Sequence, residues 1–153
     1  MIVRKLVPHE FDVTVNLFNY YFDEAVTVIP SMAEEFDQNS ISETIKHYAT
    51  HYDYCWFNSL DNSRPVGFIA GYATECPWNN SIITANIAFV YLLESHRNID
   101  NFRLLLSEFE QWARLIKATR ITGGDIGINA ERMEKLYSHF GFKKALFMIK
   151  EFN

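Results

Sequence analysis

The chain has 153 residues, of which 48% are hydrophobic and 22% charged, so it can bury the core of one folded domain and is not intrinsically disordered. No apolar run approaches the ~20 residues of a membrane helix, and Arg4 and Lys5 are not followed by the apolar region of a signal peptide. Cys55 and Cys76 have neither metal-site spacing nor a disulfide framework. We therefore expect a cytoplasmic protein that does not engage a membrane.

Charge is divided unevenly along the sequence, whose net charge is −5. Residues 1–80 hold four Lys/Arg and eleven Asp/Glu, a balance of −7, whereas residues 81–153 hold ten and eight, a balance of +2. Nucleic-acid binding needs a basic face, so we expect no nucleic-acid partner. The division fits a cationic partner on one side and an anionic partner on the other, or simply two solvated surfaces of different charge.

The first half of the chain predicts two helices and the start of a sheet. Residues 2–7 are typical of a strand, and Pro8 suits the first turn of a helix. The apolar positions of that helix are Phe11, Val15, Phe18 and Phe22. A second helix is expected to begin at Ser40, with Glu43 completing a capping box. Its expected buried positions are Ile41, Ile45, Tyr48 and Tyr52. Residues 54–58 and 66–74 predict a hairpin across the turn at 61–65.

The second half predicts a strand–helix–strand crossover followed by one more helix and strand. Residues 82–93 are typical of a strand buried on both faces, and Asn98 or Asp100 can cap the helix that follows. The apolar positions of this helix are Phe102, Leu105, Leu106, Phe109, Trp112, Ala113 and Ile116. A strand is expected at 120–128, a helix from Asn129 through Phe140 with Gly141 as its left-handed stop, and a last strand at 142–152. This order predicts one α/β (α+β) domain over 1–153, with a central mixed sheet, helices on both faces and a parallel pairing of 82–93 with 120–128.

The turn after Leu93 is a candidate anion site. It brings the start of a helix to the carboxyl edge of the sheet, where free N–H groups and the helix dipole attract negative charge. Arg97 and Arg103 could add charge-assisted contacts to phosphate, or they could be ordinary surface residues.

The end of the chain carries a more specific pattern, Leu136-Tyr137-x-x-x-Gly141-Phe142. It resembles the late motif of the Gcn5-related N-acetyltransferase (GNAT) family, N-x-x-A-x-x-L-Y-x-x-x-G-F. Asn129 stands one residue further from the tyrosine than in that motif, and Met133 occupies the region of its small residue. The resemblance implies a GNAT-like acyl-CoA N-acyltransferase fold. Many GNAT-like bacteriophage proteins are similar over the last 60 residues. The resemblance therefore leaves open a phage-encoded origin, with the host cytoplasm as the location of the protein.

The resemblance implies that acetyl-CoA is the co-substrate and lies along the fourth strand and the loop after it. The residues that would bind it are Tyr91, Leu92, Leu93, Arg97, Asn98, Ile99, Asp100, Asn101, Phe102, Arg103 and Asn129. The family's loop motif, R/Q-x-x-G-x-G/A, is altered here, because aligning its first position with Arg97 places Asp100 and Phe102 where small residues belong. Two alternatives remain open: Asp100 turns away and the loop still holds pyrophosphate, or the site has degenerated and the fold serves binding.

The resemblance also implies that Tyr137 is the acid that protonates the departing thiolate. The general base stays open, because 82–93 contains no acidic residue. Its candidates are Glu75, Glu94, His47, His51 or an ordered water. The acceptor side would involve Glu34, Glu35, Glu75 and Asn86. Glu24 and the acidic stretch Glu34–Asp37 would favour a cationic amine.

These observations predict an N-acyltransferase that moves an acetyl group from acetyl-CoA to a primary amine by direct attack in a ternary complex. The amine could belong to a small molecule, a protein N-terminus or a lysine. The alternative is a non-catalytic binding or structural protein with the same fold. We expect no metal, because His47 and His51 stand at i, i+4 without a third ligand nearby. Either a monomer or a homodimer is compatible with the sequence.

Overall fold

A computed structural model describes residues 1–124, 129–145 and 150. Within these residues five strands form one sheet in the order β1-β2-β3-β4-β5. They are β1 (Ile2–Lys5), β2 (Tyr54–Asp61), β3 (Arg64–Cys76), β4 (Asn79–Leu92) and β5 (Arg120–Thr122). The helices are α1 (Phe11–Val28), α2 (Gln38–Thr50), α3 (Ile99–Leu115) and α4 (Ala130–His139), with 3₁₀ turns η1 (Pro8–Glu10), η2 (Pro30–Glu35) and η3 (Glu94–His96). The pairs from β1 to β4 are antiparallel and β4–β5 is parallel, so the predicted mixed sheet and crossover are confirmed.

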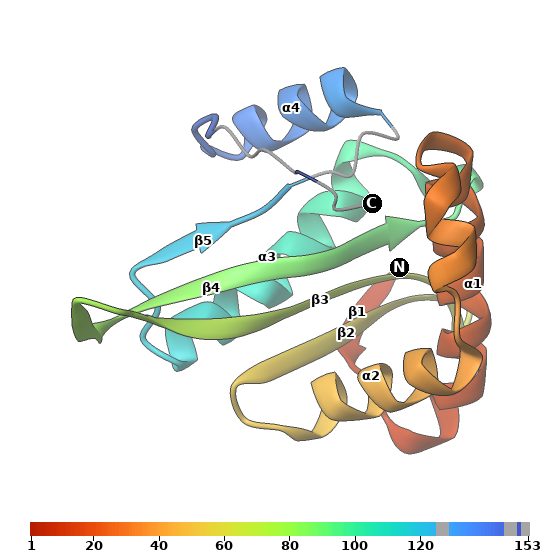
Figure 1. The fold of residues 1–153 in the computed structure, drawn as a ribbon, viewed down its shortest axis with the longest axis horizontal. Coiled ribbons are helices and arrows are strands. Elements are labelled where there is room, and N and C mark those ends of the chain that lie inside the picture. Colours follow the sequence, from red (N-terminus) through yellow and green to blue (C-terminus); the bar gives the residue numbers. More distant parts are fainter. Residues whose placement is uncertain (125–128, 146–149, 151–153) are drawn as a thin grey trace.

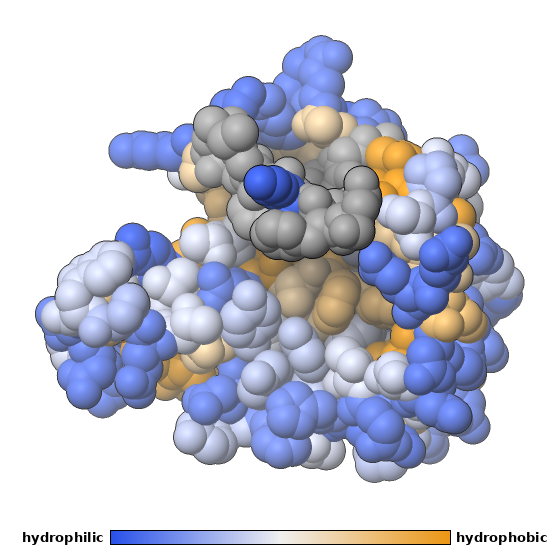
Figure 2. All heavy atoms as spheres, in the orientation of Figure 1, coloured by the Kyte–Doolittle hydropathy of each residue, from blue (hydrophilic) through white to orange (hydrophobic). Residues whose placement is uncertain are grey.

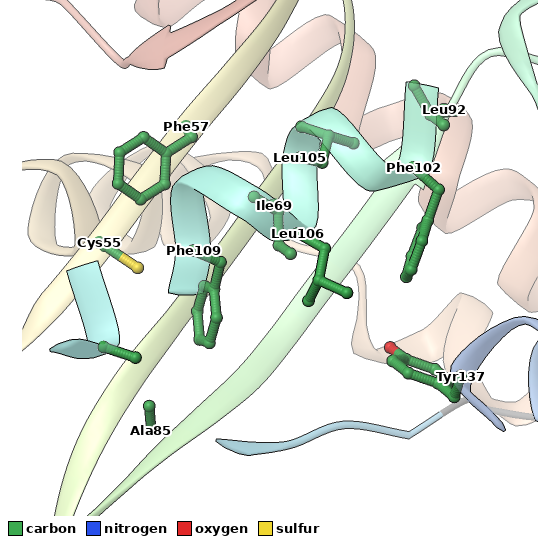
Figure 3. Packing of buried hydrophobic residues seen from close by; sticks show 11 residues of the cluster. Cys55, Phe57, Ile69, Ala85, Leu92, Phe102, Leu105, Leu106, Phe109 and Tyr137 are labelled. Atoms are coloured by element: carbon green, nitrogen blue, oxygen red, sulfur yellow. The ribbon is translucent and has the colours of Figure 1, made fainter. Parts of the chain in front are cut away.

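Helices cover both faces of the sheet, as the sequence predicted (Figure 1). The core under α1 and α2 is largely aromatic, and Phe18, Trp56 and Phe68 pack with ring centroids 4.9–6.2 Å apart. The core under α3 mixes aliphatic and aromatic side chains, and Figure 3 shows Phe109 and Leu106 pointing from α3 toward the strands. Within the described residues no helix is both long and apolar enough to cross a bilayer.

A buried polar network ties α1 to β2. The Asn58 side chain donates to Thr14 Oγ1 at 2.8 Å and to Glu10 Oε2 at 3.3 Å, and its Oδ1 accepts from the Trp56 indole at 3.1 Å. Arg4 pairs with the other oxygen of Glu10 at 2.5 Å. Because a buried carboxylate is costly unless it is paired and hydrogen-bonded, this network also fixes where α1 lies on the sheet.

One inserted residue changes the course of β4. Ala70 of β3 faces Phe89, but Gly71 faces Ile87, so Ala88 is the extra residue of a β-bulge. Gly71 is required here, because a Cβ at this position would come within 2.1 Å of the Asn86 carbonyl oxygen. On either side of the bulge, Ile87 packs in the α3 core and Phe89 in the α1/α2 core. The bulge therefore moves the side-chain alternation of β4 to the opposite face.

The partner of β4 on its other edge is short. β5 pairs with Thr84, Ala85 and Asn86, and no described strand pairs with this edge beyond Asn86. Side chains of 82–93 pack into the cores on both faces, as expected, but most of them are half-buried rather than fully buried. The long apolar run correctly indicates a central strand. It contains no information about where the pairing of β4 with β5 ends.

Several boundaries differ from the sequence-based expectations. α2 begins at Gln38 rather than at Ser40, because the Asp37 side chain caps it by accepting from the Asn39 N–H. Tyr52, expected to be buried, is 85% exposed, since the helix ends before it. Asn98 caps α3, whose apolar stripe is confirmed. Gly141 is confirmed in the left-handed region, with φ +85.

Two predicted strands extend beyond what the structure describes. Of the strand expected over 120–128, β5 (Arg120–Thr122) is confirmed, Gly123 and Gly124 are not in a strand, and residues 125–128 lie outside the described residues. Of the strand expected over 142–152, residues 142–145 and 150 are not in a strand, and the remainder lies outside the described residues.

Candidate active site

Beyond Asn86, one backbone edge of β4 has no partner strand among the described residues. The Leu93 N–H donates to the Val66 carbonyl of β3 at 2.9 Å. In an antiparallel pair, adjacent residues present their backbone groups to opposite edges of the strand. The carbonyl of Leu92 accordingly faces away from β3 and accepts from Arg97 Nε at 2.7 Å. An unpaired edge of this kind can hydrogen-bond an extended ligand as if the ligand were another strand.

The loop that follows β4 is held by its own polar groups. The Asn98 side chain accepts from the Asn101 N–H at 2.9 Å, and the Asn101 side chain donates to the His96 carbonyl at 2.7 Å. The N–H groups of Ile99 and Asp100, the first two of α3, have no acceptor among the described residues. These two donors and the dipole of α3 form the candidate anion site that the sequence predicted.

Arg97 does not extend into this anion site. Its Nη2 lies 2.5 Å from Glu24 Oε1, and the same carboxylate oxygen accepts from the Tyr91 hydroxyl at 2.7 Å. Burial lowers the pKa of Arg97, but the hydrogen bond and charge of Glu24 outweigh it and raise that pKa above its ordinary value. Burial, followed by the hydrogen bond to Glu24, raises the pKa of Tyr91. Glu24 therefore binds Arg97 and Tyr91 beside the loop. The sequence instead predicted that it would lie beside the acceptor amine.

The second arginine of the loop is also paired. Arg103 Nη1 lies 2.6 Å from Asp100 Oδ1, one turn back on α3. A different arginine, Arg132 of α4, donates to the Arg97 carbonyl at 3.4 Å and makes no ion pair within the described part of the chain. The start of α4 thus meets the loop after β4 and brings an unneutralised cation to it. Sequence reasoning missed Arg132, because nothing in the local pattern joins two residues 35 positions apart.

Phe102 belongs to the core rather than to a ligand surface. Its side chain is 3% exposed and packs against Tyr137 and Phe140, while its N–H donates to the Asn98 carbonyl. Asn129 precedes α4, and its side chain makes no capping hydrogen bond. The structure thus brings the end of β4, the loop and the first turns of α3 and α4 together, but within this group Phe102 has a packing role.

Tyr137 lies beside the place where β4 and β5 part. Its ring packs edge-on against Phe102, with centroids 5.7 Å apart, and against Phe142 at 4.9 Å. A Cβ at Gly123 would come within 2.9 Å of this ring, so the glycine permits the close approach. The hydroxyl is 3.5 Å from the Gly124 carbonyl oxygen and is directed away from α4 (Figure 3). Tyr137 therefore packs between Phe102 of α3 and the glycine that follows β5.

A cavity of about 140 Å³ opens on the α1/α2 face. Its lining combines apolar and acidic side chains: Phe18, Phe22, Glu35, Asp37, Ser40, Ile41, Thr44, Ile45 and Phe89. Figure 2 shows hydrophobic side chains gathered in a hollow above α2. Hydrogen bonds from the Ser40 hydroxyl and then the Asn39 N–H lower the pKa of Asp37. The cavity therefore has an apolar floor that includes Phe89, next to the bulge, and an ionised edge.

The other residues assigned to the acceptor lie apart from this cavity. Glu34 is exposed on η2 and does not line it. Glu75 lies toward the exposed end of the β3–β4 hairpin, opposite Ile83. The Asn86 amide donates to Tyr72 O and Thr74 Oγ1, so it joins strands and is not directed at a ligand.

The histidines lie beside a second, more open hollow of about 410 Å³. Its lining residues are Glu43, Thr44, His47, Tyr48 and Tyr54. The His47 and His51 rings stack with centroids 3.7 Å apart, and His51 Nδ1 lies 3.1 Å from the His47 carbonyl oxygen. Burial raises the pKa of Tyr48 to about 12, so it is not a base. Among the described residues, no group of three or more His, Cys, Asp or Glu side chains is placed to hold a metal ion.

Comparison with solved structures identifies the fold. The sequence matches no protein-family model and no curated protein. The structure is similar to a probable acetyltransferase, with TM-score 0.75, 17% identity and coverage of 100% of this chain and 97% of that chain. It is also similar to the aminoglycoside N-acetyltransferase AAC(6')-Iy in complex with CoA, with TM-score 0.74, 10% identity and coverage of 99% and 98%. A third is the ribosomal-protein-alanine N-acetyltransferase from Brucella melitensis biovar Abortus, with TM-score 0.72, 12% identity and coverage of 99% and 100%. The chain has the GNAT fold.

We expect a substitution of Asp100 to strengthen the binding of CoA. Asp100→Asn removes a carboxylate beside the orphan N–H groups of α3 and releases the guanidinium of Arg103. We expect the Kd for CoA, measured by titration calorimetry at low salt, to fall about threefold. Glu110→Gln, near the other end of α3, is the matched control and should leave the Kd unchanged. Weaker binding of the Asp100 variant would show that this end of α3 does not face the phosphates.

Proposed function

We propose that this protein transfers an acetyl group from acetyl-CoA to a primary amine. The observation that carries the proposal is the edge of β4 beyond Asn86, which has no partner strand among the described residues and leads to the Ile99 and Asp100 N–H groups at the start of α3. An extended thioester on this edge would place its pyrophosphate at the start of α3. The shared fold and the CoA bound to a similar structure support this arrangement.

The proposed reaction combines a thioester on the edge of β4 with an amine from the cavity beside Phe89. The neutral amine attacks the thioester carbonyl, a C–N bond forms, and collapse of the tetrahedral adduct breaks the C–S bond. Tyr137 donates a proton to the departing thiolate, and the amine loses its surplus proton to water. We assign no side chain as the base: Glu75 lies toward the exposed end of the β3–β4 hairpin, and His47 lines the hollow beside Tyr48 and Tyr54.

The cavity beside Phe89 supports an amine with an apolar part as the acceptor. Its volume, about 140 Å³, is close to that of an engineered apolar cavity of about 150 Å³ that binds benzene. The carboxylates of Glu35 and Asp37 at its edge would attract an ammonium group. Similar structures include an aminoglycoside N-acetyltransferase, so a small-molecule amine is the acceptor class that the comparisons support best.

A thermal melt with and without acetyl-CoA tests the donor side. Binding at 100 times Kd adds ~2.7 kcal/mol to the free energy of unfolding, which corresponds to a rise in Tm of about 5–10 °C for a chain of this size. The competing function, a non-catalytic scaffold, is favoured by Asp100 and Phe102, whose side chains stand where the family's loop has small residues. No rise in Tm at millimolar acetyl-CoA would support that alternative and overturn the proposal.

Tyr137→Phe tests the chemistry separately from binding. Loss of the proton donor should lower kcat about 100-fold, while the Kd for acetyl-CoA stays within a factor of two. The measurement is thiol release from acetyl-CoA with a panel of small amines, together with a calorimetric titration. Tyr72→Phe, a partly buried tyrosine in β3, is the matched control. Equal kcat in the Tyr137 variant and the wild type would remove Tyr137 as the acid.

Glu35 and Glu34 form a matched pair on the acceptor side, because they are neighbours but Glu35 alone of the two lines the cavity. Glu35→Gln should raise the KM for a cationic amine about three- to tenfold with little change in the KM for acetyl-CoA. Glu34→Gln should leave both constants unchanged. The assay is a steady-state titration of each substrate; equal effects of the two substitutions would show a diffuse surface-charge effect in place of a binding contact.

A further inference from the structure

Glu24 occupies a junction between two parts of the chain that are distant in sequence. From α1 it reaches Arg97, 73 residues on, and Tyr91, 67 residues on. The Arg97 guanidinium also lies over the Tyr91 ring, 5.2 Å from its centroid. Figure 1 shows why these groups meet, since the arrowhead of β4 ends beside α1.

The same guanidinium holds the loop after β4 from its other side. Arg97 Nε donates to the Leu92 carbonyl, so one planar group joins α1, the end of β4 and the loop. Arg97 and Glu24 are partly buried and Tyr91 and Leu92 are buried, and in such surroundings charge-assisted hydrogen bonds are stronger than at an open surface. A guanidinium with two fixed donors sets an orientation that a flexible ammonium cannot reproduce.

We propose that Glu24 and Arg97 are positioning residues, which hold the loop so that the N–H groups of Ile99 and Asp100 face the pyrophosphate of acetyl-CoA. This inference rests on the proposed function. It assigns Arg97 a role different from a phosphate ligand, since its Nη2 and Nε are directed at Glu24 and Leu92. Positive charge toward the phosphates then comes from Arg132 and from the dipole of α3.

The two possible roles of Arg97, phosphate ligand and positioning residue, predict opposite effects of Glu24→Ala on the Kd for CoA. If Arg97 bound phosphate, Glu24→Ala would free its charge, remove a nearby carboxylate and strengthen CoA binding. If Glu24 positions the loop, the same substitution weakens CoA binding, about tenfold in Kd. Arg97→Lys keeps the charge but replaces two nitrogens of one rigid plane with a single ammonium nitrogen, so it should also weaken binding. The double variant Glu24→Ala/Arg97→Ala should bind no worse than Arg97→Ala alone, because both changes remove one shared contact.

The experiment is calorimetric titration of each full-length variant with CoA, followed by steady-state kinetics with acetyl-CoA. Asp23→Asn is the control, since Asp23 is the exposed neighbour of Glu24 on α1 and makes no ion pair in the described part of the chain. It should leave the Kd unchanged. The KM for acetyl-CoA should rise in Glu24→Ala, whereas kcat at saturation should stay within about twofold of the wild type. Tighter binding by Glu24→Ala, or an unaltered Kd, would overturn the positioning role.

Amide hydrogen exchange on the free protein separates this inference from the proposed function. Glu24→Ala should speed exchange at least about tenfold in peptides that cover residues 97–103, and Asp23→Asn should not. If the wild type binds no CoA but this exchange pattern appears, the proposed function fails and the junction still holds the loop. If exchange of the loop is the same in all variants, the junction does not hold the loop, whatever the wild type binds.

Discussion

The parting of β4 from β5 after Asn86 is the constraint on which the rest of the structure depends. Backbone donors and acceptors must be paired, solvated or given to a ligand, and beyond this point no described strand pairs with this edge of β4. The Tyr137 ring of α4 packs close to Gly123, where a Cβ would come within 2.9 Å of it. The donor site that we propose follows this edge to the start of α3.

Charge in the loop after β4 is largely neutralised before any ligand arrives. Arg97 pairs with Glu24 and Arg103 with Asp100, so neither guanidinium is available without breaking a contact. A loop of this kind attracts a polyanion by backbone N–H groups and the helix dipole more than by side-chain charge. Such attraction depends on geometry, since N–H groups are directional and short in range. This is why a junction that fixes the loop matters more here than it would in a loop with exposed arginines.

The sequence predicted the elements well and the site less well, for identifiable reasons. The apolar stripe of α3 and the stop at Gly141 are local patterns, and both are confirmed. Tyr52 was assigned to a buried stripe because the periodicity of α2 continues past the end of the helix, which no local signal marked. The contact of Glu24 with Arg97 joins residues 73 apart, so no spacing rule could reveal it. The prediction for Tyr137 rested on a resemblance and stays a prediction.

The bulge at Ala88 also links the two proposed substrate sites. In an uninterrupted strand, side chains two residues apart share a face, so Phe89 would follow Ile87 into the α3 core. The inserted residue instead turns Phe89 toward α1 and α2, where it forms part of the cavity floor. The same insertion lies in the part of β4 whose outer edge has no partner strand among the described residues. One extra residue therefore sets both the wall that an amine would meet and the edge that a thioester would follow, so neither site can be moved along β4 without moving the other.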